Sequence, residues 1–186
     1  MNKKYQIIYA DPPWDFGCKA YQDGGRDMLL LSETKYKTMS IQDIKNLPIS
    51  NIIDNDCALF LWTTDAHLEF AIQVINSWGF KYKTIGFLWL KKYANGSRVY
   101  NFAPWTLKSS EMCLLGLKGR MGKLKKKNNV KGLVEETRTD HSKKPNEVRN
   151  RIVELFGDIP RIELFARKKT EGWDVWGNEV ESNIEL

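Results

Sequence analysis

The apolar positions of the chain are concentrated in short runs, separated by helix-like and polar stretches. The runs at residues 5–10, 57–63, 82–91, 111–117 and 160–166 read YQIIYA, CALFLWT, YKTIGFLWLK, EMCLLGL and PRIELFA. Runs of this length that are rich in β-branched and aromatic residues are typical of strands buried on both faces. Much of the core is therefore expected in one sheet.

Between these runs, apolar residues recur at helical spacing over residues 66–78 and 146–156. Each stretch is followed by a glycine, Gly79 or Gly157, and glycine commonly ends a helix. A shorter helix is expected over residues 40–47, from a serine cap to the proline that follows. The succession of strand, helix and strand predicts βαβ units and a parallel sheet.

The length and composition suit a single globular domain, residues 1–186, because hydrophobic residues make up 42% and charged residues 28%. Three long polar stretches, at about residues 15–37, 92–110 and 118–133, are expected to be substrate loops. No apolar run approaches the ~20 residues that span a bilayer, and the N-terminus leads straight into a strand. A cytoplasmic protein without a membrane partner is therefore expected.

Cysteine, histidine and lysine content limits the chemistry further. The three cysteines and two histidines form no ligand-spaced pair, so neither a disulfide framework nor a metal site is expected. The net charge of +6 favours polyanionic partners. Lys125, Lys126 and Lys127 belong to a basic run over residues 121–131. Such a run is either a solvated loop or an arm that contacts phosphates, and both interpretations remain open.

The tetrapeptide Asp11-Pro12-Pro13-Trp14 directly follows the first expected strand. Two successive prolines fix the backbone and remove two donors, so the carbonyls of Asp11 and Pro12 are expected to lack a local N–H partner and to face a ligand. A carboxylate, free carbonyls and a flat ring suit a planar group that carries an amino donor. The alternative is an ordinary turn with an incidental tryptophan.

Trp62, Trp89, Lys118 and Arg167 also stand near the ends of expected strands. Ligands of open α/β sheets bind outside the carboxyl ends of the strands, so these residues are expected to converge with Asp11 on one crevice. For any single tryptophan a place in the core is the commoner outcome, so the expectation depends on the whole set. The sequence has neither a G-x-G-x-x-G nor a P-loop motif, which disfavours a dinucleotide or P-loop nucleotide site.

A series of short motifs extends over nearly the whole chain, from Tyr9 to Glu179. They are YADPPWDF at 9–16, KYKTM at 35–39, LFLWTT at 59–64, GFLWLK at 86–91, SEMCLLGLKG at 110–119, HSKKPNEV at 141–148, and RIELFAR and GWDVWGNE near the C-terminus. In this order they resemble the MT-A-type adenine-N6 methyltransferase family, whose members methylate messenger RNA or, in bacteria and phages, DNA. The resemblance implies S-adenosylmethionine as methyl donor and no metal. It also implies a Rossmann-like methyltransferase fold, with helices on both faces of a mostly parallel sheet and a permuted order in which the catalytic motif precedes the cofactor motif.

The resemblance assigns roles position by position. Asp11 and the Pro12 carbonyl of the DPPW motif, which includes Pro13, would accept hydrogen bonds from the adenine amino group, and Trp14 would stack on the base. The substrate-binding set comprises Tyr36, Trp62, Trp89, Lys125, Lys126 and Lys127. The cofactor-binding set comprises Lys118, His141, Ser142, Lys143, Pro145, Phe165, Arg167, Asn178 and Glu179.

The sequence therefore predicts an S-adenosylmethionine-dependent enzyme that methylates adenine N6 in DNA, with the base extruded from its stack into a pocket around DPPW. Methylation of RNA adenine remains open. A catalytically silent nucleic-acid-binding partner subunit also remains open, although the intact Asp11 and Asn178 favour activity. A homodimer or a paired methyltransferase subunit is compatible with each of these functions.

Overall fold

A single sheet forms the middle layer of the protein. The computed structural model describes residues 3–15, 38–103, 105–137 and 143–186. Within these residues seven strands pair in the order β5-β3-β4-β2-β1-β6-β7, which places β1 and β2 inside the sheet. The strands are β1 (Tyr5–Ala10), β2 (Ile53–Thr63), β3 (Lys81–Lys92), β4 (Ser110–Lys118), β5 (Leu133–Thr137), β6 (Arg161–Leu164) and β7 (Asp174–Trp176).

The sheet is mostly parallel, as the sequence predicts. The pairs β1–β2, β1–β6, β3–β5 and β6–β7 are parallel, whereas β4 is antiparallel to both β2 and β3. The carboxyl ends of the parallel strands therefore meet along one edge, together with the beginning of β4. We call this the carboxyl edge. Lys118, at the end of β4, pairs with Cys57 near the opposite edge.

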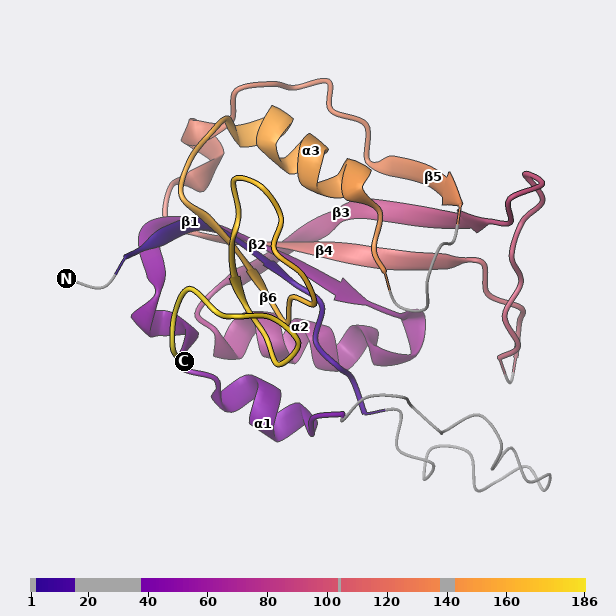
Figure 1. Cartoon of the computed structure of the whole chain (residues 1–186), viewed down its shortest axis with the longest axis horizontal. Helices are drawn as coiled ribbons and strands as arrows, with labels where there is room; N and C mark the ends of the chain where they lie inside the picture. Colours follow the sequence, from indigo (N-terminus) through magenta and orange to yellow (C-terminus); the bar gives the residue numbers. More distant parts are fainter. Residues whose placement is uncertain (1–2, 16–37, 104, 138–142) are drawn as a thin grey trace.

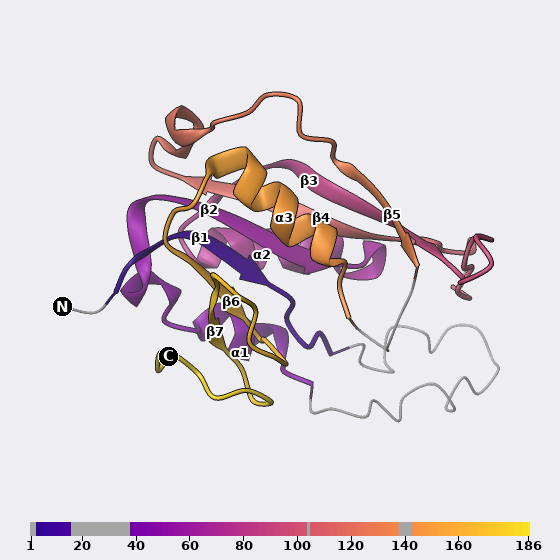
Figure 2. The same ribbon diagram turned by 45° about the horizontal axis from the view of Figure 1, so that its top comes forward.

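Helices cover both faces of the sheet (Figure 1, Figure 2). The helices α1 (Ile41–Asn46) and α2 (Leu68–Ser77) pack with Ile8 on one face, and α3 (Asn146–Phe156) packs with Ile7 on the other. Adjacent residues of β1 enter different core clusters because successive side chains of a strand point to opposite faces. Short 3-10 turns complete the elements, namely η2 (Ile49–Asn51), η3 (Asp65–His67) and η4 (Met121–Leu124).

The observed boundaries agree well with the sequence pattern. The helix α3 has the predicted bounds and is followed by Gly157 at φ 84°, and Gly79 after α2 has φ 83°. These positive φ values are the region that glycine enters without steric cost. The predicted helix over residues 66–78 begins later, at Leu68, because residues 65–67 form η3. At β7 the sequence predicts only an aromatic segment that folds back onto the domain.

The described residues contain no helix whose length and apolar character would let it cross a membrane.

Candidate active site

Asp11 begins a chain of ion pairs along the carboxyl edge. Lys144 Nζ lies 2.7 Å from Asp11 Oδ2 and 3.3 Å from Glu111 Oε2. Glu111 also pairs with Lys91. The four side chains come from the end of β1, the approach to α3, the beginning of β4 and the end of β3. Only 10% of the Lys144 side chain and 27% of the Asp11 side chain are exposed, so these charges interact at low effective dielectric.

Burial and neighbouring charges shift the pKa values of Asp11, Lys144 and Glu111. Burial raises the pKa of Asp11, and the attraction of Lys144 offsets this effect only in part. Burial would lower the pKa of Lys144, but Asp11 and Glu111 together outweigh it and raise that pKa. Burial would likewise raise the pKa of Glu111, but Lys144 and Lys91 outweigh it and lower that pKa. Lys144 therefore remains a cation between two carboxyl groups.

Two backbone hydrogen bonds hold the turn after Asp11. The Trp14 N–H donates to the Pro12 carbonyl at 2.9 Å, and the Met39 N–H donates to the Pro13 carbonyl at the same distance. The expectation that the Pro12 carbonyl lacks a local N–H partner is therefore wrong, because the chain turns sharply enough for the residue two positions on to reach it. One lone pair of this carbonyl oxygen stays available for a second donor.

Trp14 is fixed at its edge and on one face. Its Nε1–H donates to the Trp62 carbonyl at 3.0 Å, and its ring stacks on His67 with centroids 5.9 Å apart and planes 23° apart. His67 Nδ1 lies 3.1 Å from the Thr64 hydroxyl. Only 5% of Trp14 is exposed, so the ring is part of a stiff platform beside Asp11.

Trp62 and Trp89 are core residues in this structure, with 0% and 4% of their surface exposed. The Trp62 Nε1–H donates to the Tyr9 hydroxyl at 2.7 Å, and the Trp89 Nε1–H donates to the Glu136 carbonyl at 3.0 Å. Lys144 Nζ lies 5.6 Å from the centre of the Trp62 ring, within range of a cation–π contact. Trp62 thus supports the cation that holds Asp11, and the alternative of a core tryptophan fits both residues.

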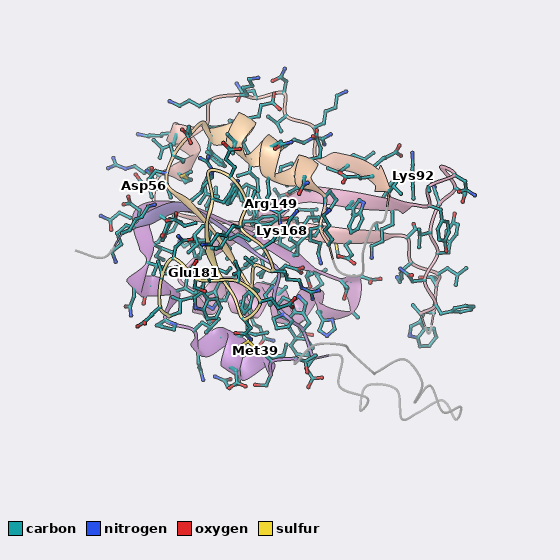
Figure 3. All side chains as sticks on the ribbon, in the orientation of Figure 1. Met39, Asp56, Lys92, Arg149, Lys168 and Glu181 are labelled. Atoms are coloured by element: carbon teal, nitrogen blue, oxygen red, sulfur yellow. The ribbon has the colours of Figure 1, made fainter. Side chains whose placement is uncertain are left out.

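The structure does not bring Lys118 to Asp11. The antiparallel direction of β4 places Lys118 at the opposite edge, close to Asp56, whose carboxylate accepts the Arg120 N–H at 2.6 Å. In Figure 3 the labelled Asp56 and Lys92 stand at opposite ends of the sheet. The expectation of one shared crevice therefore fails for Lys118, because it assumed that every strand ends at the same edge.

Lys125, Lys126 and Lys127 also lie away from Asp11. The Lys126 N–H donates to the Leu155 carbonyl at 2.8 Å, and Lys127 Nζ lies 2.9 Å from Glu154 Oε1. Both contacts are at the C-terminal end of α3, whereas Lys144 precedes the N-terminal end. An α-helix rises ~1.5 Å per residue, so the 11 residues of α3 separate the two regions by about 16 Å.

The ends of β6 and β7 bring several of the predicted cofactor residues together. Phe165, at φ 61°, packs edge-on against Trp176 at a centroid distance of 5.4 Å. Arg167 Nε lies 3.5 Å from Glu179 Oε1, and Asn178, which follows β7, is exposed. The positive charge of Arg167 also lowers the pKa of Asp11, against the larger effect of burial, so both groups belong to one electrostatic site.

The closeness of these two strand ends depends on a glycine. A Cβ on Gly177 would lie 2.2 Å from the Ala166 carbonyl oxygen, a distance that no side chain tolerates. Of the remaining predicted residues, Lys143 is exposed and Pro145 is buried at the start of α3. Tyr36, His141 and Ser142 lie outside the described residues.

Sequence reasoning missed Lys144, Glu111 and Lys91. The HSKKP motif contains two adjacent lysines, and only the fold decides which of them turns towards Asp11. A signal for Glu111 was present, because no helix is predicted between the strands at 82–91 and 111–117. A connection without a crossover helix favours antiparallel neighbours, and it would have placed the beginning of the second strand at the carboxyl edge.

A buried ion pair on the α3 face was also missed. Arg149 binds Glu163 through two hydrogen bonds, of 2.8 Å and 2.5 Å, and its guanidinium lies 4.9 Å from the centre of the Tyr9 ring. This pair joins α3 to β6 directly beneath the carboxyl edge. Within the described residues, no group of three or more His, Cys, Asp or Glu side chains could hold a metal ion.

Comparison with known proteins identifies the family of the chain. The family model MT-A70 matches residues 5–179. The Type II methyltransferase M.MunI of Mycoplasma sp is 38% identical over 193 residues, which cover 98% of this chain and 80% of that protein. The catalytic subunit METTL3 of the N(6)-adenosine-methyltransferase of Homo sapiens is 27% identical, and the alignment covers 96% of this chain but 28% of the human protein. An N(6)-adenosine-methyltransferase MT-A70-like protein of Drosophila melanogaster is 28% identical over 96% of this chain and 27% of its own length. With these motifs at the ends of β1, β6 and β7, and with a family match over nearly its whole length, the chain belongs to the MT-A70 family.

Proposed function

We propose that this protein transfers a methyl group from S-adenosylmethionine to the exocyclic amino group of adenine in DNA. The observation on which this proposal chiefly depends is the Asp11 carboxylate at the end of β1, held by Lys144 and adjoining the stiff DPPW turn. Membership of the MT-A70 family and the similarity to a Type II methyltransferase support the same reaction. The target base must leave its stack to reach Asp11.

The acceptors at the turn suit an amine that is a poor nucleophile. The lone pair of the adenine amine is delocalised into the ring, and two acceptors that grip its hydrogens favour a more pyramidal nitrogen. Asp11 supplies one acceptor, and the free lone pair of the Pro12 carbonyl supplies the other. Because the turn is fixed by its own hydrogen bonds, these acceptors need little reorganisation when charge develops on the nitrogen.

The charges of the site fit the methyl donor. A methionine head group carries a carboxylate and an ammonium, and the carboxyl edge offers the cations Lys144 and Arg167 together with the carboxylates Asp11 and Glu111. When bound, S-adenosylmethionine supplies an electrophilic methyl group. Lys143, Pro145, Phe165, Asn178 and Glu179 complete the proposed donor-binding set. Lys144 is the better placed residue for the donor carboxylate, since Lys118 lies at the opposite edge.

The permuted motif order is part of the proposal. DPPW follows β1, whereas the donor-binding residues follow β6 and β7, much later in the chain. The strands β1 and β6 are nevertheless neighbours in the sheet, so catalytic and donor-binding residues stand side by side. We further infer that the enzyme works in the cytoplasm, alone, as a homodimer or with a paired methyltransferase subunit.

The proposal is tested by identifying the labelled nucleoside. The purified protein is incubated with S-adenosylmethionine labelled in its methyl group and with matched DNA and RNA, and the products are digested to nucleosides. Label in N6-methyldeoxyadenosine is expected. Label only in N6-methyladenosine of the RNA would favour the second candidate, which the similarity to METTL3 supports. Label on cytosine, or no label with intact donor binding, would refute the proposed reaction.

A further inference from the structure

The connection between β3 and β4 exposes an unusual amount of aromatic surface. Phe102 is 87% exposed and Trp105 is 94% exposed, and further large apolar side chains of this connection are about half exposed, namely Tyr93, Tyr100 and Leu107. We call the described residues 93–103 and 105–109 the aromatic loop. Two rings that are almost fully solvated cost free energy, and a cluster of them marks an interaction surface.

The aromatic loop is built onto the carboxyl edge. It leaves β3 at Lys92 and returns at Ser110, next to Glu111 of the site. Figure 1 shows the loop projecting beyond the ends of β3 and β4, and Figure 3 shows ring side chains along it past the labelled Lys92. The loop is ordered by its own contacts, since Asn101 and Lys108 exchange backbone hydrogen bonds of 2.7 Å and 2.9 Å. Paired backbone at Asn101 and Lys108 therefore flanks the two exposed rings.

Lysines of the loop and of its base form partly exposed ion pairs. Lys108 Nζ lies 2.5 Å from Asp65 Oδ2, and Asp65 follows the carboxyl end of β2. At the base of the loop, Lys92 pairs with Glu135 of β5 at 2.6 Å. Between 30% and 42% of each of these four side chains is exposed, and ion pairs at such sites contribute little. Both lysines can therefore exchange a carboxylate for a phosphate at low cost.

The charge of the segment favours nucleic acid over protein as the occupant. The sequence from residue 91 to residue 110 contains four cationic residues, Lys91, Lys92, Arg98 and Lys108, and neither Asp nor Glu. Aromatic rings interleaved with cations are typical of surfaces on which bases stack while the backbone is held electrostatically. The cores of protein interfaces, in contrast, are depleted of lysine.

We propose that the aromatic loop contacts the nucleic-acid substrate, with Phe102 and Trp105 stacking on bases beside the adenine that is extruded towards Asp11. This inference rests on the proposed methylation of DNA and assigns its substrate contact to a specific part of the chain. It develops the expectation of a substrate loop at residues 92–110, whereas lysines 125–127 of the basic run lie near the far end of α3. Stacking also compensates the neighbours of an extruded base for the contacts they lose.

The test compares single variants in a binding assay that does not depend on catalysis. Affinity is measured by fluorescence anisotropy with a labelled mixed-sequence oligodeoxynucleotide, both single-stranded and as a duplex. Replacing Phe102→Ala or Trp105→Ala is expected to raise the Kd about 5- to 150-fold, the effect of losing one base–aromatic stack. Binding of S-adenosylmethionine, measured by titration calorimetry, and the melting temperature should remain those of the wild type, because both rings are almost fully solvated.

Two further variants separate stacking from simple apolar contact. Trp105→Tyr keeps a ring and should retain most of the affinity, whereas Trp105→Leu keeps an apolar side chain without a ring and should lose it. Tyr82→Ala is the matched control, because Tyr82 is an exposed aromatic residue, 39% accessible, at the opposite end of β3. Its Kd for the oligonucleotide should equal that of the wild type.

The other outcomes distinguish failure of the inference from failure of the proposed function. Affinities of Phe102→Ala and Trp105→Ala equal to the wild type would exclude the loop as a nucleic-acid contact. A lower mass in light scattering at unchanged affinity would make the loop a protein interface instead. Failure of the wild type to methylate adenine would refute the proposed function, but the anisotropy comparison would still decide what the aromatic loop binds.

Discussion

Lys144 determines the electrostatics of the site. Its ammonium faces Asp11 on one side and Glu111 on the other, above the ring of Trp62. A buried carboxylate without this cation would be strongly disfavoured in its ionised form. Lys144 thus lets Asp11 act as a hydrogen-bond acceptor, and Glu111 with Lys91 keeps Lys144 in position.

Replacement of Asp11 should separate catalysis from folding. We expect Asp11→Ala to abolish methyl transfer and Asp11→Asn to lower kcat about 100- to 1000-fold, the usual effect of losing one preorganised polar contact. Donor binding, followed by titration calorimetry, should persist because Lys144 keeps Glu111. An active Asp11→Ala protein would contradict the mechanism.

The stability of the same variants follows from the direction of the pKa shift. The pKa of Asp11 in the folded protein lies above its unfolded value, so its contribution to stability is present below the unfolded pKa and is lost as the pH rises through the folded pKa. At neutral pH the raised pKa of Asp11 therefore lowers the free energy of unfolding. The melting temperature of Asp11→Asn should therefore lie no more than about 4 °C below that of the wild type.

The pH profile of the reaction should report on Lys144. Protonation turns one oxygen of Asp11 into a donor and makes the carboxyl group a weaker acceptor, so kcat/KM falls on the acid side as Asp11 is protonated. Lys144→Met removes the attraction that lowers the pKa of Asp11, and the acid limb should move to higher pH. Lys169→Met, at a solvent-exposed pair with Glu181, should leave the limb in place. If the acid limb of kcat/KM in Lys144→Met is unchanged or moves to lower pH, a group other than Asp11 controls it.

At the scale of elements, the pair of Arg149 and Glu163 fixes α3 against β6. Both side chains are at most 10% exposed, and they form two hydrogen bonds with each other. Lys144 lies just before α3, and Arg167 lies just after β6, so the pair also sets the distance between the two halves of the site.

Breaking this pair should destabilise the protein strongly. Glu163→Gln leaves a buried guanidinium without its counter-charge, at a cost of about 3–5 kcal/mol in the free energy of unfolding. Glu147→Gln is the control, because it breaks the i,i+4 pair with Arg151 on the surface of the same helix and should cost no more than about 0.5 kcal/mol. Urea denaturation of both variants measures the difference. Equal losses would mean that the buried pair is not what holds α3.

The sequence predicts most elements of this fold because their signals are local. The helix α3, its terminal Gly157 and the apolar runs of β1 and β2 are visible in the spacing of side chains alone. Strand direction is not local, because it depends on which strands become neighbours. The sequence signal for the direction of β4 is indirect, the absence of a crossover helix before it, and the places of Lys118 and Glu111 became clear from the structure. The DPPW turn was located correctly, but the bond from Trp14 to the Pro12 carbonyl depends on backbone angles that the residue types leave open.

At the scale of the whole molecule, the two ends of the sheet carry different charges and roles. The carboxyl edge holds paired charges of both signs around Asp11, whereas Lys125, Lys126 and Lys127 lie near the opposite end of α3. The net charge of +6 supports a general attraction to polyanions that does not require every lysine to reach the site.

Neutralising the distant lysines should therefore affect binding but not chemistry. In the triple variant Lys125→Ala, Lys126→Ala and Lys127→Ala, the affinity for DNA should depend less steeply on salt, because fewer phosphate contacts release counterions. The single-turnover rate at saturating DNA should remain that of the wild type. A marked fall in this rate would place these lysines at the reacting base and would contradict the distance given by α3.

The antiparallel direction of β4 also bears on how such an enzyme can change its target. Because β3 ends and β4 begins at the same edge, the chain between them leaves and re-enters the sheet without crossing it. Its length and composition can vary without disturbing the register of any strand. The segment that meets the substrate can therefore be exchanged, in evolution or by protein engineering. The residues around Asp11 stay the same when it is exchanged.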